Sequence, residues 1–94
     1  MLTSIPSQPA GLISVLSDPS AEFGDRCDAA LDLGAFDEPE AEMALLSVTL
    51  DHQADADLVD HAGNSLWEIW SRKGTVSEAL VARMHPEARK FFQR

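Results

Sequence analysis

Apolar residues recur along most of this chain at the spacing of an α-helix, and the alternating pattern of a half-buried β-strand is missing. Proline- and glycine-containing turn signals interrupt the pattern and divide the chain into short segments. Tyr is absent and β-branched residues do not cluster, so nothing favours a sheet. The sequence therefore predicts an all-α fold of five to six helices joined by short loops.

The turn signals give approximate bounds for these helices. The expected helices span about 8–17, 21–35, 39–50, 56–73 and 77–85, and a short final helix starts at Pro86. Ser7 is the expected cap of the first helix, and Gly74 is the expected stop of the fourth.

The position of the apolar residues indicates which side of each helix faces the core. The segment 39–50 is apolar nearly all round, which predicts that it is packed between neighbours. In segment 56–73, Trp70 falls within the apolar stripe and Trp67 at its edge, and the Phe91–Phe92 pair is expected to dock back onto the body. The inward side of segment 21–35 is expected to consist of Phe23, Cys27, Ala30, Leu31 and Gly34.

Size and composition are those of one globular domain that spans residues 1–94. The single Cys27 excludes an internal disulfide, which fits a reducing compartment. The N-terminal residues lack the basic start of a signal peptide, and no apolar run approaches the length of a membrane span. We therefore expect a cytoplasmic protein.

The chain also contains an internal echo at a spacing of 36 residues. Ala30 and Leu33 correspond to Leu66 and Ile69, and the run 41–48 corresponds to the run 77–84. A helix pair that repeats at such a period is typical of an α-solenoid, in which each pair packs against the next.

One part of the chain resembles a known repeat family. The run 25–36, DRCDAALDLGAF, together with Pro39-Glu40-Ala41 and Ala44-Leu45, resembles the HEAT-like repeat of the phycobilisome-lyase type. The second unit, 55–84, keeps the helix pattern but has Ile69-Trp70 in place of the Leu-Gly of the first. The resemblance implies a short right-handed stack of about two HEAT-like hairpins. It also implies a protein-binding role, because HEAT-like units generally bind other proteins.

Charge is distributed very unevenly along the chain. Residues 1–71 carry fourteen acidic side chains and one basic one, Arg26, whereas residues 72–94 carry six basic and two acidic side chains. An acidic body of about −13 repels nucleic acid and membrane surfaces and attracts basic proteins. The basic tail is expected to pair with carboxylates of the body or to be solvated.

Two acidic clusters and one Trp are the candidate binding residues. Asp25, Asp28 and Asp32 form a stripe on the expected second helix, and Asp51, Asp55, Asp57 and Asp60 surround the start of the fourth. Three interpretations are open for each cluster: a solvated face, a docking surface for a basic partner, or a divalent-cation site. Trp67, beside Glu68, either covers a neighbouring helix or anchors an interface.

No residue pattern in the chain points to catalysis. His52, His61 and His85 are scattered in the sequence, and Cys27 lies at the centre of an apolar face, where an inert core thiol is expected. Glycine-rich phosphate loops are missing. We therefore expect no enzyme activity, no cofactor and no metal.

These observations together favour a protein-binding module of bacterial origin. Small acidic helical proteins of this appearance occur as immunity proteins of bacterial toxins, so the leading hypothesis is an inhibitor that occludes a basic toxin such as a nuclease. The partner-binding residues would be Asp25, Asp28, Asp32, Asp55, Asp57, Asp60, Trp67 and Glu68. The alternatives are a HEAT-like scaffold without an inhibitory role and a non-catalytic subunit of a lyase-type enzyme.

Overall fold

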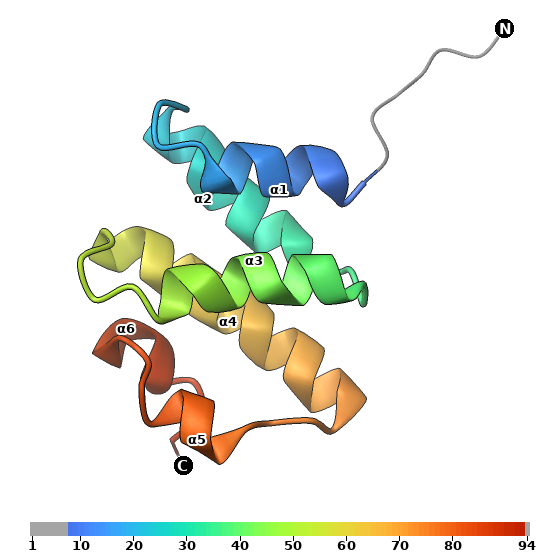
Figure 1. Cartoon of the computed structure of the whole chain (residues 1–94), viewed down its shortest axis with the longest axis vertical. Coiled ribbons are helices and arrows are strands. Elements are labelled where there is room, and N and C mark those ends of the chain that lie inside the picture. The colour runs from blue at the N-terminus through green and yellow to red at the C-terminus, as the bar shows by residue number, and fades with distance from the viewer. Residues whose placement is uncertain (1–7, 94) are drawn as a thin grey trace, which may run out of the picture.

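The computed structural model describes residues 8–93, and within this range every regular element is a helix, which confirms the all-α class (Figure 1). The six helices of this range are α1 (Ala10–Ser17), α2 (Phe23–Leu33), α3 (Pro39–Thr49), α4 (Ala56–Lys73), α5 (Glu78–Val81) and α6 (Pro86–Arg89). None of these helices has the length and apolar character that crossing a membrane requires.

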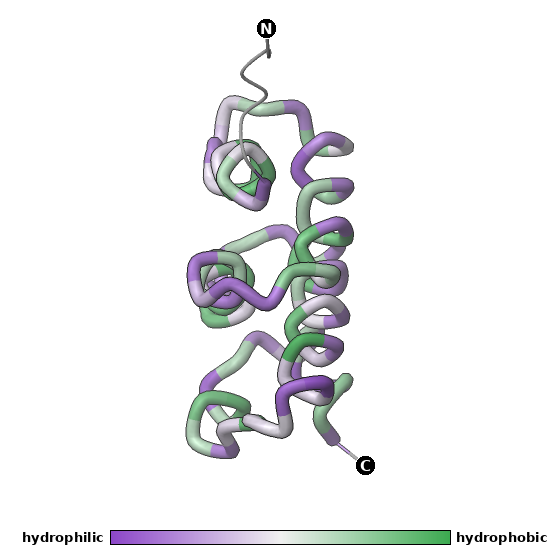
Figure 2. Tube along the Cα trace, turned by 90° about the vertical axis from the view of Figure 1, so that its right-hand side faces the viewer, coloured by the Kyte–Doolittle hydropathy of each residue, from purple (hydrophilic) through white to green (hydrophobic). Residues whose placement is uncertain are grey.

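The four longer helices form two layers. Figures 1 and 2 show α1 and α3 running side by side in one layer, with α2 and α4 in the layer behind them. Helix α1 packs on α2 and α3 packs on α4, while α2 and α4 contact each other and join the two pairs. The short α6 packs on α4. The result is a flat, elongated body of 49 × 29 × 15 Å.

Helix α4 is the centre of the core, and its bounds agree with the sequence-based prediction. It begins after Asp55, whose side chain accepts a hydrogen bond from the Asp57 amide at 2.8 Å. It ends at Gly74, which has a φ of 68°, a conformation that glycine adopts without strain. Its buried side contacts α2, α3 and α6. The residues of this helix that are buried are Leu58, Val59, Ala62, Gly63, Ser65, Leu66, Ile69 and Trp70.

Gly63 allows α6 to approach α4 closely. A Cβ atom added at Gly63 would lie 2.7 Å from the Cα of Ala88 and 3.1 Å from the ring of Phe91. Phe92 makes an edge-to-face contact with Trp70, with the ring centres 5.6 Å apart. The expected docking of the Phe91–Phe92 pair is therefore confirmed.

The fifth helix is shorter than expected, whereas the short final helix begins at Pro86 as predicted. Helix α5 ends at Val81 instead of continuing to about residue 85. The amide of His85 donates instead to the carbonyl of Thr49 at 2.8 Å. Pro86 follows, and the residue before a proline is disfavoured in helical conformation; His85 accordingly has a ψ of 141°. The echo of 41–48 in 77–84 therefore does not produce a second full-length helix.

The N-terminal helices also begin later than expected. Helix α1 starts at Ala10, with Pro9 in the cap position, and the predicted cap Ser7 lies outside the described residues. Helix α2 spans Phe23–Leu33, two residues shorter at each end than the expected 21–35.

The predicted buried face of α2 was partly wrong. Cys27, Ala30 and Gly34 are buried as expected, but Leu31 is 42% exposed and Phe23 is 44% exposed. Helix α2 packs against both α1 and α4, so its buried arc is centred between its two neighbours and takes in Ala29 and Leu33. Leu31 falls just outside that arc.

Helix α3 is packed by several neighbours, as its apolar character predicts, but it is not enclosed. It contacts α1, α2, α4 and α6. Ala41, Leu45 and Thr49 are buried, whereas Met43 is 66% exposed on the side that no helix covers.

Candidate acidic docking surface

The three aspartates of the α2 stripe lie on the outside of the molecule, as the sequence predicts. Asp25, Asp28 and Asp32 are all exposed. In the part of the chain that the structure describes, no Lys or Arg forms an ion pair with any of them. Like charges at this spacing on a helix repel each other by a few tenths of a kcal/mol per pair. The stripe therefore lowers the stability of α2 slightly and is not compensated within residues 8–93.

The fold brings this stripe close to the start of α4. The pKa of the Cys27 thiol is raised, first by burial and then by the negative charges of Asp55, Asp57 and Asp28. A carboxylate of α2 and two at the start of α4 therefore lie near enough to this thiol for their charge to act on it. We call the exposed carboxylates of Asp25, Asp28, Asp32, Asp55 and Asp57 the acidic face.

Asp60 is separated from the acidic face by its pairing. Its carboxylate lies 2.7 Å from the ammonium of Lys90, which also contacts Glu87 at 2.9 Å. Hydrogen bonds to these two carboxylates raise the pKa of Lys90. Asp51 is not among the carboxylates whose charge acts on the Cys27 thiol, and its side chain accepts a hydrogen bond from the Gln53 amide and stabilises a turn. The predicted second cluster is thus divided, and only its Asp55 and Asp57 join the acidic face.

Trp67 and Glu68 lie further along α4. Trp67 is half-buried, which confirms its expected position at the edge of the apolar stripe. Glu68 is exposed and lies against the end of α2, since a Cβ atom added at Gly34 would be 2.6 Å from its Oε1 atom. The two helices are joined nearby by Ser65, whose hydroxyl donates to the carbonyl of Ala30 at 2.6 Å.

Several cations of the described residues make contacts away from the acidic face. Arg26 donates from Nε and Nη2 to the carbonyl of Leu16, at 3.0 and 2.9 Å, and so satisfies the end of α1. Arg72 pairs with Asp37, and Lys73 pairs with Glu42. This confirms that cations of the tail pair with carboxylates of the body, and none of these ion pairs reaches the acidic face.

Two of these roles were not found from the sequence. Arg26 stands out in the sequence as the lone cation of residues 1–71, but nothing in the pattern assigns it the contact with Leu16. Glu42 accepts a hydrogen bond from the indole N–H of Trp70 at 2.7 Å and also binds Lys73, so it connects α3 to α4. No local sequence pattern reveals a contact over this separation.

Two of the three histidines lie together in the structure although they are far apart in the sequence. The rings of His52 and His85 stack with centres 5.7 Å apart. His52 bonds the carbonyl of Arg83 through Nε2, and His85 accepts a hydrogen bond from the Glu87 amide through Nδ1. His61 is half-buried on α4. Within residues 8–93 no group of three or more His, Cys, Asp or Glu side chains is placed to hold a metal ion.

Comparisons with known proteins add no relative. No family model, no curated protein and no solved structure matches this chain.

Proposed function

We propose that this chain is a protein-binding module without a catalytic step, and that it acts as an immunity-type inhibitor of a basic partner enzyme such as a nuclease toxin. The observation that supports this most strongly is the acidic face, where carboxylates from α2 and α4 lie together without cations from residues 8–93. The HEAT-like resemblance of residues 25–45 agrees with a role in binding proteins.

The mechanism would be electrostatic steering followed by occlusion. Complementary charge raises the association rate above the value for neutral partners and discriminates against acidic competitors. Carboxylates at positions that phosphates occupy in the substrate of a nuclease would compete for the same Lys and Arg side chains. Asp25, Asp28 and Asp32 are the residues of α2 that would make these contacts.

Leu31 adds a feature that the sequence-based hypothesis lacked. It is 42% exposed and lies on α2 between Asp28 and Asp32. An exposed apolar side chain that a partner covers is removed from water, which favours binding. We therefore add Leu31 to the proposed contact residues.

The direct experiment is co-expression with the protein encoded immediately upstream. We expect that protein to be toxic alone and to be neutralised by the parent chain. Asp28→Lys should abolish protection, whereas Glu78→Lys, the same change of charge on α5, should not. An upstream protein of metabolic function that is harmless when expressed alone would contradict the inhibitor proposal and favour the enzyme-subunit alternative.

Salt dependence tests the steering mechanism separately. Between about 50 and 500 mM salt the Debye length falls several-fold, so the association rate should fall while the dissociation rate changes less. An association rate that is indifferent to salt would contradict steering by the acidic face.

A further inference from the structure

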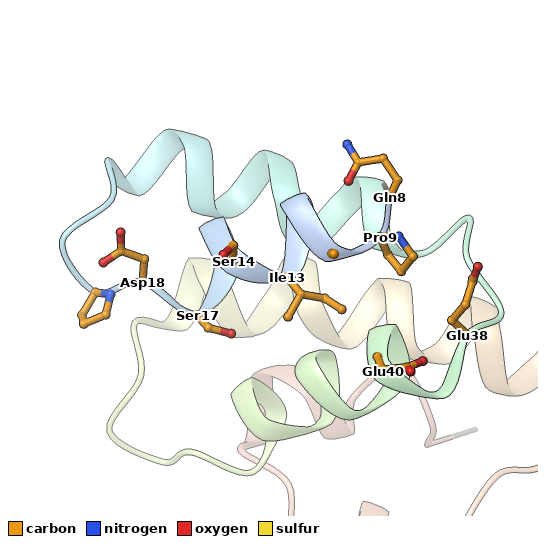
Figure 3. Close-up of a pocket in the computed structure, with 10 residues that line it drawn as sticks. Gln8, Pro9, Ile13, Ser14, Ser17, Asp18, Glu38 and Glu40 are labelled. Atoms are coloured by element: carbon orange, nitrogen blue, oxygen red, sulfur yellow. The ribbon is translucent and has the colours of Figure 1, made fainter. Parts of the chain in front are cut away.

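A groove lies on the opposite helix layer from the acidic face. It has a volume of about 840 Å³ and runs between α1 and the beginning of α3 (Figure 3). Figure 3 shows Ile13 reaching from α1 toward α3, with Glu38 and Glu40 at one end of the groove and Asp18 at the other. The remaining lining residues are Gln8, Pro9, Ala10, Ser14, Ser17 and Pro19.

Small side chains on α1 create the hollow. Ala10, Ser14 and Ser17 follow each other at helical spacing on the side that lines the groove, and all three side chains are short. Ile13 is half-buried and forms an apolar floor. Helix α1 itself carries no charged residue.

The charges at the two ends of the groove are all negative. Glu38 and Glu40 are exposed and form no ion pair with any residue in the described range 8–93. The Asp18 carboxylate accepts hydrogen bonds from the side chain and the amide of Ser20, which lower the pKa of Asp18 and keep it ionised. No Lys, Arg or His lines the groove.

We propose that this groove is a second docking surface, which binds a segment of a partner protein that carries Lys or Arg side chains around an aliphatic or aromatic residue. The apolar residue of that segment would pack on Ile13 and Pro9. Its cations would pair with Glu38 and Glu40 at one end and with Asp18 at the other. An acidic or purely polar segment lacks this complementarity. The negative ends of the groove and its apolar floor therefore both favour a segment with cations around an apolar residue. The inference does not depend on the acidic face, because α1 and α3 supply the groove and α2 and α4 supply that face.

The test uses the full 94-residue chain labelled with ¹⁵N and a short peptide in which lysines flank two leucines. Titration should shift the amide resonances of Ile13, Ser14, Ser17 and Glu40. A peptide with serines in place of the leucines should bind more weakly, and a peptide with glutamates in place of the lysines should not bind. Equal binding of the glutamate peptide, or shifts confined to α2 and α4, would overturn the proposal.

Matched variants separate the groove from general attraction to an acidic protein. Glu38→Lys with Glu40→Lys should weaken binding by about tenfold or more, whereas Asp25→Lys with Asp28→Lys, the same change of net charge, should have a much smaller effect. Ser14→Phe fills the hollow and should also abolish binding, while Ser71→Phe on α4 should not. Equal losses in the two charge variants would overturn the proposal.

Two other occupants give distinct results in the same spectra. If a second copy of the chain filled the groove, the groove resonances of the free protein would shift with protein concentration. If residues 1–7 filled it, Leu2→Ser with Ile5→Ser would shift these resonances without any peptide. Either result would overturn the assignment of the groove to a partner protein.

Discussion

At the scale of single residues, one carboxylate makes two polar contacts between α3 and α4. Glu42 accepts the indole N–H of Trp70 and binds the ammonium of Lys73. Trp70 is only 2% exposed, so its N–H has little access to water if Glu42 is removed. A donor left without a partner in such a site costs far more than an ordinary hydrogen bond contributes.

Glu42→Ala is therefore expected to lower the free energy of unfolding by about 1–3 kcal/mol in urea denaturation. Glu40→Ala is the matched control, because Glu40 also lies in the first turn of α3 but its side chain forms no hydrogen bond or ion pair within residues 8–93, and its effect should stay within about 0.5 kcal/mol. Similar losses in the two variants would show that the helix dipole, and not the Trp70 contact, gives Glu42 its effect.

Cys27 gives a prediction about pH. Its folded-state pKa is raised above the ordinary thiol value, so the folded protein holds the thiol proton more tightly than the unfolded chain does. The associated stability is fully present below the ordinary thiol pKa and is lost as the pH rises from that value through the raised pKa of the folded state. The difference in unfolding free energy between the parent and Cys27→Ala should therefore shrink from pH 7 to about pH 10. A difference that stays constant over this range would contradict the role of burial and the neighbouring aspartates.

At the scale of the helices, α2 shows why its buried face was only partly predictable. A sequence reveals the apolar stripe of an isolated helix, but the arc that is buried depends on the angle between its neighbours. Here α1 and α4 cover Ala29 and Leu33, and the arc leaves Leu31 outside. Two leucines only two residues apart thus have opposite environments.

Leu33→Ala and Leu31→Ala should therefore differ strongly in stability. Leu33 is fully buried, so its truncation should cost about 2–5 kcal/mol in unfolding free energy, whereas truncation of Leu31 should cost less than about 1 kcal/mol. Equal losses would place Leu31 in the core after all and would remove it from the proposed contact residues.

The bounds of the helices were predictable where local chemistry decides them. Asp55 and Gly74 determine the two ends of α4, and both are visible in the sequence. Helix α5 ends early because its backbone turns to meet Thr49, a contact that no local pattern reports. The same distinction applies to the candidate site. The sequence predicts that Asp28, Asp55 and Asp57 are exposed, but their proximity results from the packing of α2 on α4, which no local pattern reports.

The start of α6 depends on an unusual cap. His85 accepts the Glu87 amide through Nδ1 at 3.0 Å, so its neutral form must carry the proton on Nε2. His85→Asn retains a side-chain acceptor, whereas His85→Ala removes it, and caps of this kind contribute about 0.5–2 kcal/mol. Amide hydrogen exchange at Glu87 and Ala88 should therefore be faster in the Ala variant than in the Asn variant. Equal exchange in the two variants would show that the cap has no effect and that stacking on His52 or the Thr49 contact holds this segment.

At the scale of the whole molecule, two electrostatic effects of opposite sign act on the fold. A net charge of −9 on 94 residues destabilises the compact state through self-repulsion, which salt screens. The ion pairs Arg72–Asp37 and Lys90–Asp60 are exposed at the surface, where water and salt screen them, so each contributes little to stability. Repulsion spread over the acidic body should therefore dominate.

We accordingly expect the melting temperature to rise when sodium chloride increases from about 50 to 500 mM. Chloride is the appropriate anion, because sulfate stabilises folded proteins by exclusion from their surface whatever their charge. The variant Asp28→Lys with Asp32→Lys removes part of the repulsion on α2, so it should melt no lower than the parent at low salt and gain less from added salt. A melting temperature that falls with salt would show that the ion pairs outweigh the repulsion. The acidic face would then not lower the stability of the fold, and its charge would no longer need an explanation in terms of binding.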